Sequence, residues 1–143
     1  MIARIVKSDE ELQDAYDVRT KVFVEEQHVP EEEEIDQFER EASHVVLYDG
    51  DKPVGAGRFR ILNGIGKIER ICVLPDYRSK GAGKIIMEKL EEVAASKEMQ
   101  TLKLNAQTHA EPFYEKLGYN TISKETFLDA GIPHVTMVKE IKA

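Results

Sequence analysis

The chain has little of what disulfide or metal-cluster chemistry requires. Among its 143 residues Cys72 is the only cysteine, and tryptophan is absent. A single thiol excludes an internal disulfide and a thiolate metal cluster, and it is typical of a protein from a reducing compartment. The four histidines are scattered without the spacing of metal ligands, so we predict no metal site.

Long apolar runs and an excess of positive charge are also missing. No segment reaches transmembrane length, and the first residues lack the pattern of a signal peptide. The 20 Lys and Arg residues against 27 Asp and Glu give a formal net charge of −7. This balance disfavours binding to nucleic acid or to an anionic membrane. We therefore expect a soluble, cytoplasmic protein made of a single domain, residues 1–143.

The most informative stretch joins a short strand to an amphipathic helix. Residues 68–74 are apolar and largely β-branched, Pro75 ends this run, and apolar residues recur at helical spacing over 82–96. Gly81 and Gly83 thus lie at a helix start, where free backbone amides and the helix dipole favour an anion. Without a Cβ atom, glycine also lets a ligand approach the backbone.

Three cations accompany these glycines, namely Arg78, Lys80 and Lys84. So many positive charges in seven residues suit a diphosphate better than a single carboxylate. Neither a Walker A loop nor a dinucleotide fingerprint fits, because Arg78 and Ile86 stand where those motifs need glycine. A helix start with a solvated basic rim is the alternative interpretation.

The remaining pattern predicts strands and helices in alternation. We expect strands at 2–6, 45–48, 53–61, 67–74, 101–105, 121–127 and 135–141, and helices from 9 to about 27, at 82–96 and at 110–117. Ser8 and Glu11 form a capping box for the first helix. This order predicts an α/β layered domain in which helices cover a largely antiparallel sheet.

An acidic run, Glu31 to Glu34, follows Pro30 and precedes Ile35 and Asp36. A proline followed by glutamates is typical of the first turn of a short helix, so the run can be a solvated helix start. It can also be an acidic lip that attracts a cationic amine, if it borders the site. The sequence leaves both interpretations open.

Two segments together resemble the GNAT superfamily of N-acetyltransferases. Residues 78–83 fit its Arg-x-x-Gly-x-Gly pyrophosphate loop after a strand ending Val-x-Pro. Residues 110–119 resemble its second signature, A-x-x-F-Y-x-K-x-G-F/Y, in the expected order and at the expected separation. Residues 19–27, 34–36 and 130–135 are also similar to the small bacterial ElaA-like branch of the superfamily.

The resemblance implies an α/β fold with a mixed, largely antiparallel sheet of six or seven strands flanked by about four helices. The sheet would split near residues 68–74, and the pantetheine arm of acetyl-CoA would lie between the strands. The implied reaction is direct attack of an amine on the thioester in a ternary complex. The amine belongs to an unidentified small molecule or protein, and a homodimer can form.

The resemblance also implies which residues form the site. The positions that match cofactor-binding positions are Ile71, Cys72, Val73, Arg78, Ser79, Lys80, Gly81, Ala82, Gly83, Lys84, Asn105, Phe113 and Lys116. For Asn105 a strand-end cap is the alternative role. The Cys72 side chain is expected to be buried, which disfavours an acyl-cysteine intermediate.

Two residues are candidates for proton transfer. A primary amine with a pKa of ~10 is neutral in only about one part in 10³ at pH 7, so a base is expected. Glu69 is the candidate base, with a structural salt bridge as the alternative, and Tyr114 matches the general acid that protonates the leaving thiolate, with a core aromatic as the alternative.

Two other functions remain open at this stage. A non-catalytic acyl-CoA sensor would keep the phosphate loop and close the acceptor pocket. An interaction domain would use the acidic run at Glu31 to Glu34 to bind a partner.

Overall fold

The structure is a computed structural model, and it describes residues 1–141. It contains one sheet in the order β1-β2-β3-β4-β5-β8-β6, with β7 also paired to β8. The strands are β1 (Ile2–Ile5), β2 (Ser43–Asp49), β3 (Lys52–Leu62), β4 (Ile65–Val73), β5 (Thr101–Gln107), β6 (Asn120–Thr121), β7 (Phe127–Asp129) and β8 (Ile132–Glu140). Every pairing is antiparallel except that of β4 with β5.

The helices are α1 (Asp9–Arg19), α2 (Glu31–Glu34), α3 (Ala82–Ser96) and α4 (Glu111–Lys116), together with the π-helical η1 (Thr20–Glu26) and the 3-10 turns η2 (Pro75–Tyr77) and η3 (Thr108–Ala110). The predicted fold class, a largely antiparallel mixed sheet with four α-helices, is therefore confirmed. The sheet has eight strands rather than six or seven, because β6 and β7 are very short additions along β8. Within residues 1–141, no helix combines the length and the apolar character needed to cross a membrane.

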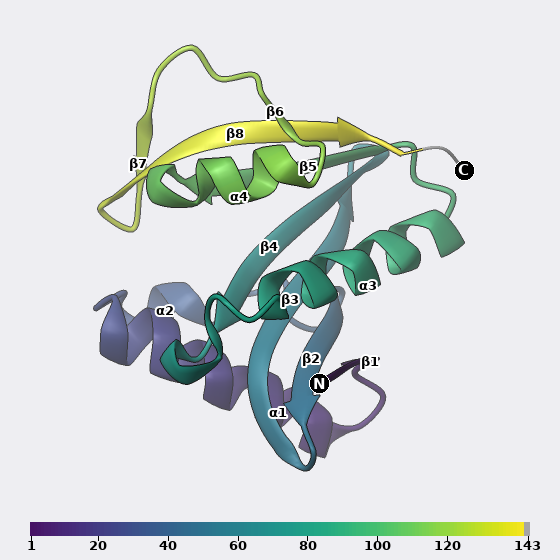
Figure 1. The fold of residues 1–143 in the computed structure, drawn as a ribbon, viewed down its shortest axis with the longest axis vertical. Helices are drawn as coiled ribbons and strands as arrows, with labels where there is room; N and C mark the ends of the chain where they lie inside the picture. Colours follow the sequence, from purple (N-terminus) through teal and green to yellow (C-terminus); the bar gives the residue numbers. More distant parts are fainter. Residues whose placement is uncertain (142–143) are drawn as a thin grey trace.

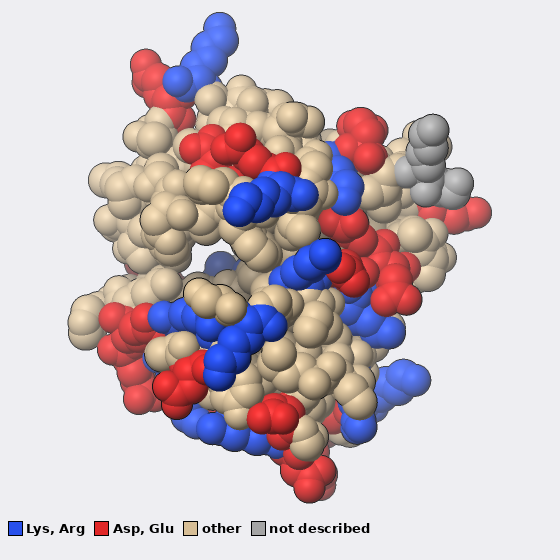
Figure 2. Space-filling model, viewed as in Figure 1, with Lys and Arg blue, Asp and Glu red and all other residues tan. Residues whose placement is uncertain are grey.

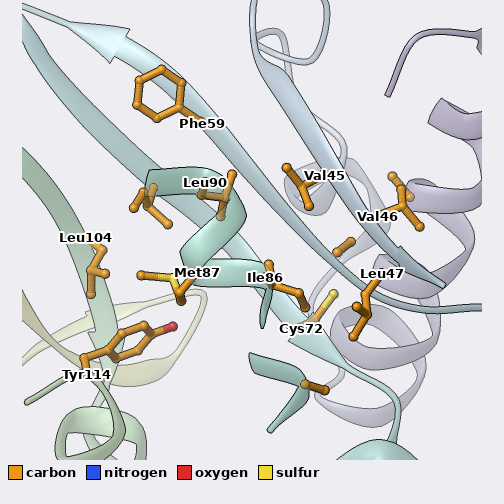
Figure 3. Packing of buried hydrophobic residues seen from close by; sticks show 14 of the residues in the cluster. Val45, Val46, Leu47, Phe59, Cys72, Ile86, Met87, Leu90, Leu104 and Tyr114 are labelled. Atoms are coloured by element: carbon orange, nitrogen blue, oxygen red, sulfur yellow. The ribbon is translucent and has the colours of Figure 1, made fainter. Parts of the chain in front are cut away.

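Both faces of the central strands are covered. Figure 1 shows α3 in front of β2, β3 and β4, and α1 behind them, and both helices contact these strands. Successive strand residues point to opposite faces, yet Val45, Val46 and Leu47 are all fully buried. In Figure 3 Leu47 lies on the Ile86 side of the strand and Val46 on the side of α1. This double cover makes the middle of the sheet a rigid base for the site.

The first helix differs from the prediction in its second half. Its N-terminus is as expected, since the Glu11 amide donates to Ser8 Oγ at 3.2 Å and the Lys7 amide donates to the Glu11 carboxylate at 2.8 Å. After Arg19, however, the chain continues as a π-helix, in which Gln27 N donates to Val22 O at 3.0 Å. A π-turn holds one more residue than an α-turn and is frequent at functional sites.

The strand predicted at 121–127 is wrong, because residues 122–126 lie outside the sheet between β6 and β7. At this interruption the Thr136 amide of β8 donates to the Ser123 side chain at 3.0 Å rather than to a backbone carbonyl. A side-chain hydroxyl that accepts the hydrogen bond of a strand amide competes with the backbone pairing between strands. A contact between distant segments therefore decided the structure here, and the local sequence did not.

The sheet splits between β4 and β5. These parallel strands pair over only three positions, Gly66 with Leu102, Lys67 with Lys103 and Ile68 with Leu104, and then separate. On its other side β4 carries a bulge at Arg70, which has a left-handed φ of 60°. A bulge bends its strand, so β4 turns away from β5 after Ile68. The opening lies where the sequence placed the phosphate loop.

Candidate active site

A cavity of about 750 Å³ occupies the opening between β4 and β5. Its walls come from the end of β4, the start of α3, the end of β5, η1, α2 and the β7–β8 turn. Figure 2 shows the hollow between the two halves of the molecule, with Lys and Arg side chains gathered on its rim near the segment that joins β4 to α3. The cavity therefore brings together segments from the whole length of the chain.

The segment between β4 and α3 presents free backbone amides to this cavity. In the described part of the chain, the amides of residues 79–84 donate to no protein acceptor, and the first amide of α3 with a partner is Ile85 N, 3.2 Å from Gly81 O. Ser79 and Gly81 have left-handed φ angles of 63° and 80°. Successive N–H groups in such a conformation form a concave anion-binding site, and the helix dipole adds to it.

The two glycines of the loop serve different purposes. Gly81 needs its left-handed backbone, and a Cβ atom there would meet nothing within 4 Å. Gly83 is in the helix, where a Cβ atom would lie 2.9 Å from Phe113 Cζ of α4. The sequence-based reason for Gly83, close approach of a ligand, is thus replaced by close approach of an aromatic ring.

Most of the predicted site residues line the cavity, namely Glu69, Ile71, Cys72, Val73, Arg78, Ser79, Gly81, Ala82, Gly83, Asn105, Phe113 and Tyr114. Lys80, Lys84 and Lys116 do not line it and are exposed. The Lys84 side chain points along α3, 3.9 Å from Glu88. The diphosphate argument from three cations is therefore weaker than the argument from the amides.

Arg78 is the predicted cation that does reach the cavity wall, and it is paired there. Its guanidinium binds both oxygens of Glu26 at 2.6 and 2.7 Å and donates to Val73 O at 2.9 Å. Glu26 is the last residue of η1, so this pair connects the π-helix to the segment between β4 and α3. A phosphate group at the loop would compete with Glu26 for Arg78.

Tyr114 is the inward-facing ring of the pair on α4. It is 8% exposed, whereas the neighbouring Phe113 is only half-buried and packs edge-on against it, with ring centroids 4.9 Å apart. In Figure 3 the Tyr114 hydroxyl points toward the side where Met87 and Cys72 lie. Burial raises the pKa of this phenol, so the hydroxyl stays protonated and can donate a hydrogen bond at neutral pH.

Glu69 lies in the cavity wall but is tightly held by cations. Its Oε1 accepts from Arg58 Nη2 at 2.7 Å and from Arg60 Nε at 2.8 Å, and its Oε2 lies 3.4 Å from Lys67 Nζ. Burial opposes ionisation, but the hydrogen bond from Arg60 and the charges of Arg58 and Lys67 outweigh it, so the pKa of Glu69 is lowered. These contacts match the structural salt bridge that the sequence left as the alternative.

Cys72 and Asn105 lie on opposite sides of the opening. Burial raises the pKa of the Cys72 thiol to about 12, so it is not a thiolate near neutral pH. Asn105 Oδ1 accepts a hydrogen bond from Thr136 Oγ1 at 2.9 Å, which leaves its amide nitrogen available. The side chains of β4 and β5 therefore offer polar atoms here but no nucleophile.

The acidic run contributes to the cavity in a way that the sequence did not reveal. Glu34 is 1% exposed rather than solvated, and its Oε1 lies 3.2 Å from Arg19 Nε and 3.0 Å from Arg70 Nε. Glu33 and Glu34 both line the cavity. The pairing depends on the bulge that turns Arg70 toward α2, and no residue pattern marks that bulge.

A split sheet with an amide-rich helix start beside the split suits a ligand that has an anionic group and an extended arm. A family profile described as the acetyltransferase (GNAT) domain matches residues 6–141. The chain belongs to this family and is an acetyltransferase.

Relatives and solved structures agree with this assignment. The chain is 57% identical over 140 residues to the uncharacterized N-acetyltransferase YjcF of Bacillus subtilis, covering 98% of this chain and 100% of that protein. The crystal structure of Escherichia coli ElaA superposes with a TM-score of 0.87 at 24% identity, covering 98% of this chain and 100% of the other. The crystal structure of an aminoglycoside 6'-N-acetyltransferase complexed with coenzyme A superposes with a TM-score of 0.80 at 19% identity, covering 100% of this chain and 98% of the other. At these identities the structures support the fold alone.

Proposed function

We propose that the protein is an N-acetyltransferase that moves the acetyl group of acetyl-CoA to an amine. The observation that supports this proposal most strongly is the run of free amides at residues 79–84, beside the split in the sheet. These amides and the start of α3 would bind the pyrophosphate of the cosubstrate. The unpaired edge of β4 at residues 69–73 would bind its pantetheine amides.

In this proposal the chain's own groups orient the reactants and move protons. Asn105 would donate to a pantetheine carbonyl, and Tyr114 would give its proton to the departing sulfur. Bound acetyl-CoA supplies the activated thioester, and the acceptor amine attacks it directly. Because the Cys72 thiol is buried and protonated, an acetyl-cysteine intermediate is not part of the proposal.

The cavity favours catalysis over the sensor alternative. A sensor needs a closed acceptor pocket, whereas this cavity continues past Glu69 to α2 and to Ile132 and His134 of β8. A volume of about 750 Å³ can hold a pantetheine arm and a small acceptor together. Localisation in the cytoplasm, the single-domain organisation of residues 1–143 and a homodimer stay predictions.

Ser79 offers a matched pair of variants that tests the phosphate site. Ser79→Asp places a carboxylate among the amides. Ser79→Asn introduces a side chain of nearly the same shape as aspartate but without its charge. Both side chains tolerate the left-handed backbone of this position. We expect Ser79→Asp to lose at least ~10-fold in CoA affinity by calorimetry, equivalent to about 1.4 kcal/mol, while Ser79→Asn binds nearly as the natural protein does.

The same preparation tests transfer, by measuring thiol release from acetyl-CoA with a panel of primary amines. We expect release that depends on the amine. Binding of CoA without release for any amine would support the sensor instead. Equal CoA affinity for Ser79→Asp and Ser79→Asn would contradict the phosphate site.

A further inference from the structure

The transfer needs a proton acceptor, and the carboxylates of the cavity wall are poorly suited to that role. Glu26 and Glu69 are bound by arginine side chains, and the Glu34 side chain is 0% exposed. Glu33 and Asp129 are exposed to solvent, and a carboxylate is about two pKa units less basic than an imidazole. An imidazole in the wall is therefore the better candidate.

Among residues 1–141, two histidines line the cavity, His109 of η3 and His134 of β8. His109 is exposed, and its Nε2 lies 2.7 Å from Gln107 Oε1. His134 is 7% exposed, and its ring stacks on that of Phe127 in β7, with the centroids 6.0 Å apart. His134 is thus the more firmly positioned of the two rings.

A hydrogen bond fixes the tautomer of His134. Its Nδ1 lies 2.6 Å from the backbone carbonyl oxygen of Ile132. A carbonyl oxygen only accepts hydrogen bonds, so Nδ1 carries the hydrogen and the neutral ring has its lone pair on Nε2. An imidazole held in this way can accept a proton through Nε2.

This lone pair is unused and open to the cavity. Within the described residues, His134 makes its side-chain hydrogen bond through Nδ1 alone. The one buried side-chain oxygen or nitrogen without a partner in the described chain is Glu34 Oε2, so the unpaired Nε2 of His134 keeps accessible surface. Polar groups of buried side chains are almost always paired, and the atom left open at this cavity wall indicates a donor supplied by a ligand.

The sheet places His134 close to the position proposed for the thioester. In the pairing of β5 with β8, His134 lies opposite Gln107, and Thr136 lies opposite Asn105, the residue proposed to hold the pantetheine. Alternate residues of a strand share a face, so His134 is on the face of Asn105 and about 7 Å along the strand from Thr136. The imidazole is within reach of an amine beside the thioester, directly or through one water molecule.

The charged groups around His134 leave it without a fixed counter-ion. Its cross-strand neighbours on β5 and β7 are uncharged. Of the titratable side chains on these strands and on η3, His109 and Asp129 line the cavity with it, whereas Lys103 does not. The one histidine of the described residues that pairs with a carboxylate is His44. The His134 ring can therefore change its charge during a reaction cycle.

We propose that His134 is the general base of the transfer and that its Nε2 takes the proton of the acceptor ammonium. This inference rests on the proposed function and adds a catalytic residue to it. The hydrogen bond from Nδ1 to Ile132 stays in place and keeps the ring oriented before and after the proton moves.

The proton balance of the step is complete. The ammonium loses one proton to His134 Nε2 and becomes a neutral amine, whose lone pair forms the bond to the thioester carbon. The carbon–sulfur bond then breaks, its electron pair leaves on sulfur, and Tyr114 protonates the sulfur. The tyrosinate takes the second proton from the new amide nitrogen, and the imidazolium returns its proton to solvent.

His134→Asn tests the base, because an asparagine amide can take the place of Nδ1 and donate to Ile132 but cannot accept a proton. Turnover is measured at saturating acetyl-CoA with n-butylamine, benzylamine and Nα-acetyl-lysine, and the amine that releases most thiol is kept. We expect kcat to fall by ~10²-fold or more, with unchanged CoA affinity by calorimetry.

The pH profile gives a readout that a merely structural role would not move. In the natural protein, kcat should fall as the pH decreases from about 8 to about 5, the range in which imidazoles take up a proton. This acid limb should be absent from His134→Asn. A His134→Asn protein that binds CoA and keeps both the turnover and the acid limb overturns the inference.

Two matched variants remove other imidazoles. His28 is exposed and outside the cavity, and its left-handed φ of 61° is one that asparagine tolerates, so His28→Asn should change neither kcat nor the profile. His109→Asn removes the second imidazole of the cavity wall and should keep the acid limb. If His109→Asn loses the limb and His134→Asn keeps it, the base is His109 and the inference is wrong.

The natural protein decides if His134→Asn does not fold. An acid limb between about pH 5 and pH 8 that persists in His109→Asn supports His134, whereas a limb below about pH 5 indicates a carboxylate base and overturns the inference. Release of thiol with none of the three amines, although CoA binds, contradicts the proposed function instead.

Discussion

Two carboxylates in one cavity wall, the buried Glu34 and the partly buried Glu69, have opposite surroundings. Both oxygens of Glu69 are near cations, supplied by Arg58, Arg60 and Lys67, and its pKa is lowered. Glu34 uses only Oε1 for its cations and leaves Oε2 unpaired, and its pKa is raised. Burial alone thus does not decide the protonation of a carboxyl, because the number of cations that reach it decides the sign.

The pairing of Glu69 gives it a structural role. Glu69 belongs to a network in which Arg58, 1% exposed, also binds Asp36 at 2.7 Å and Glu39 at 3.0 Å. This network holds the acidic segment after α2 against β3 and β4. A carboxylate so firmly held is a weak base.

The largest effect is expected when the network loses its central cation. Arg58→Met leaves Asp36, Glu39 and Glu69 without their shared partner, so we expect a loss of about 3–5 kcal/mol in the free energy of unfolding, measured by urea denaturation. Arg60→Met is the control, because Arg60 pairs with Glu69 alone among these carboxylates. Equal losses in both variants would show that the network is not centred on Arg58.

A candidate proton donor, Tyr114, lines the same cavity and extends the comparison to turnover. Tyr114→Phe removes one hydroxyl, and we expect kcat to fall by ~10²-fold or more with unchanged CoA affinity. Tyr119→Phe is the control, since that hydroxyl is also buried but donates to Glu91 at 2.9 Å, outside the cavity. If both variants keep full turnover, Tyr114 is a core aromatic only.

The smallest effect is a difference in the pH dependence of stability. Glu69 has a pKa below its ordinary 4.5, so its contribution is complete above that value and is lost as the pH falls through the lowered pKa. Glu34 has a raised pKa, so its contribution is complete below 4.5 and is lost as the pH rises through the raised pKa.

Thermal or urea unfolding between pH 3 and pH 8 measures both slopes. Relative to Glu69→Gln, the natural protein should gain stability with rising pH; relative to Glu34→Gln, it should lose stability. Slopes of the same sign would contradict the contrast between the two carboxylates.

The sequence was sufficient for the elements whose signals are local. The bounds of α3 follow from the glycines and from apolar spacing over 82–96, and the capping box marks the start of α1. The prediction of a strand at 121–127 is wrong because the Thr136 amide of β8 donates to the Ser123 side chain in place of a backbone carbonyl. This hydrogen bond is a tertiary contact, which the local sequence does not reveal.

The acceptor side of the site was beyond the sequence for a similar reason. Glu34 meets Arg19 and Arg70 only because the chain turns back after η1 and β4 bulges at Arg70. Lys80, Lys84 and Lys116 were expected at the cofactor, but none of them lines the cavity. Lys84 and Lys116 are exposed on α3 and α4, and Lys80 is exposed in the turn before α3. Spacing therefore predicted the phosphate loop, and only the folded chain reveals how the acidic run contributes to the cavity.

The central claim is that the free amides at the start of α3 bind the cosubstrate and direct its sulfur toward Tyr114. A crystal structure with acetyl-CoA tests it most directly. We predict the pyrophosphate within hydrogen-bond distance of the amides of residues 79–84, with the thioester between β4 and β5. A pyrophosphate bound elsewhere, with these amides facing only water, would contradict the claim.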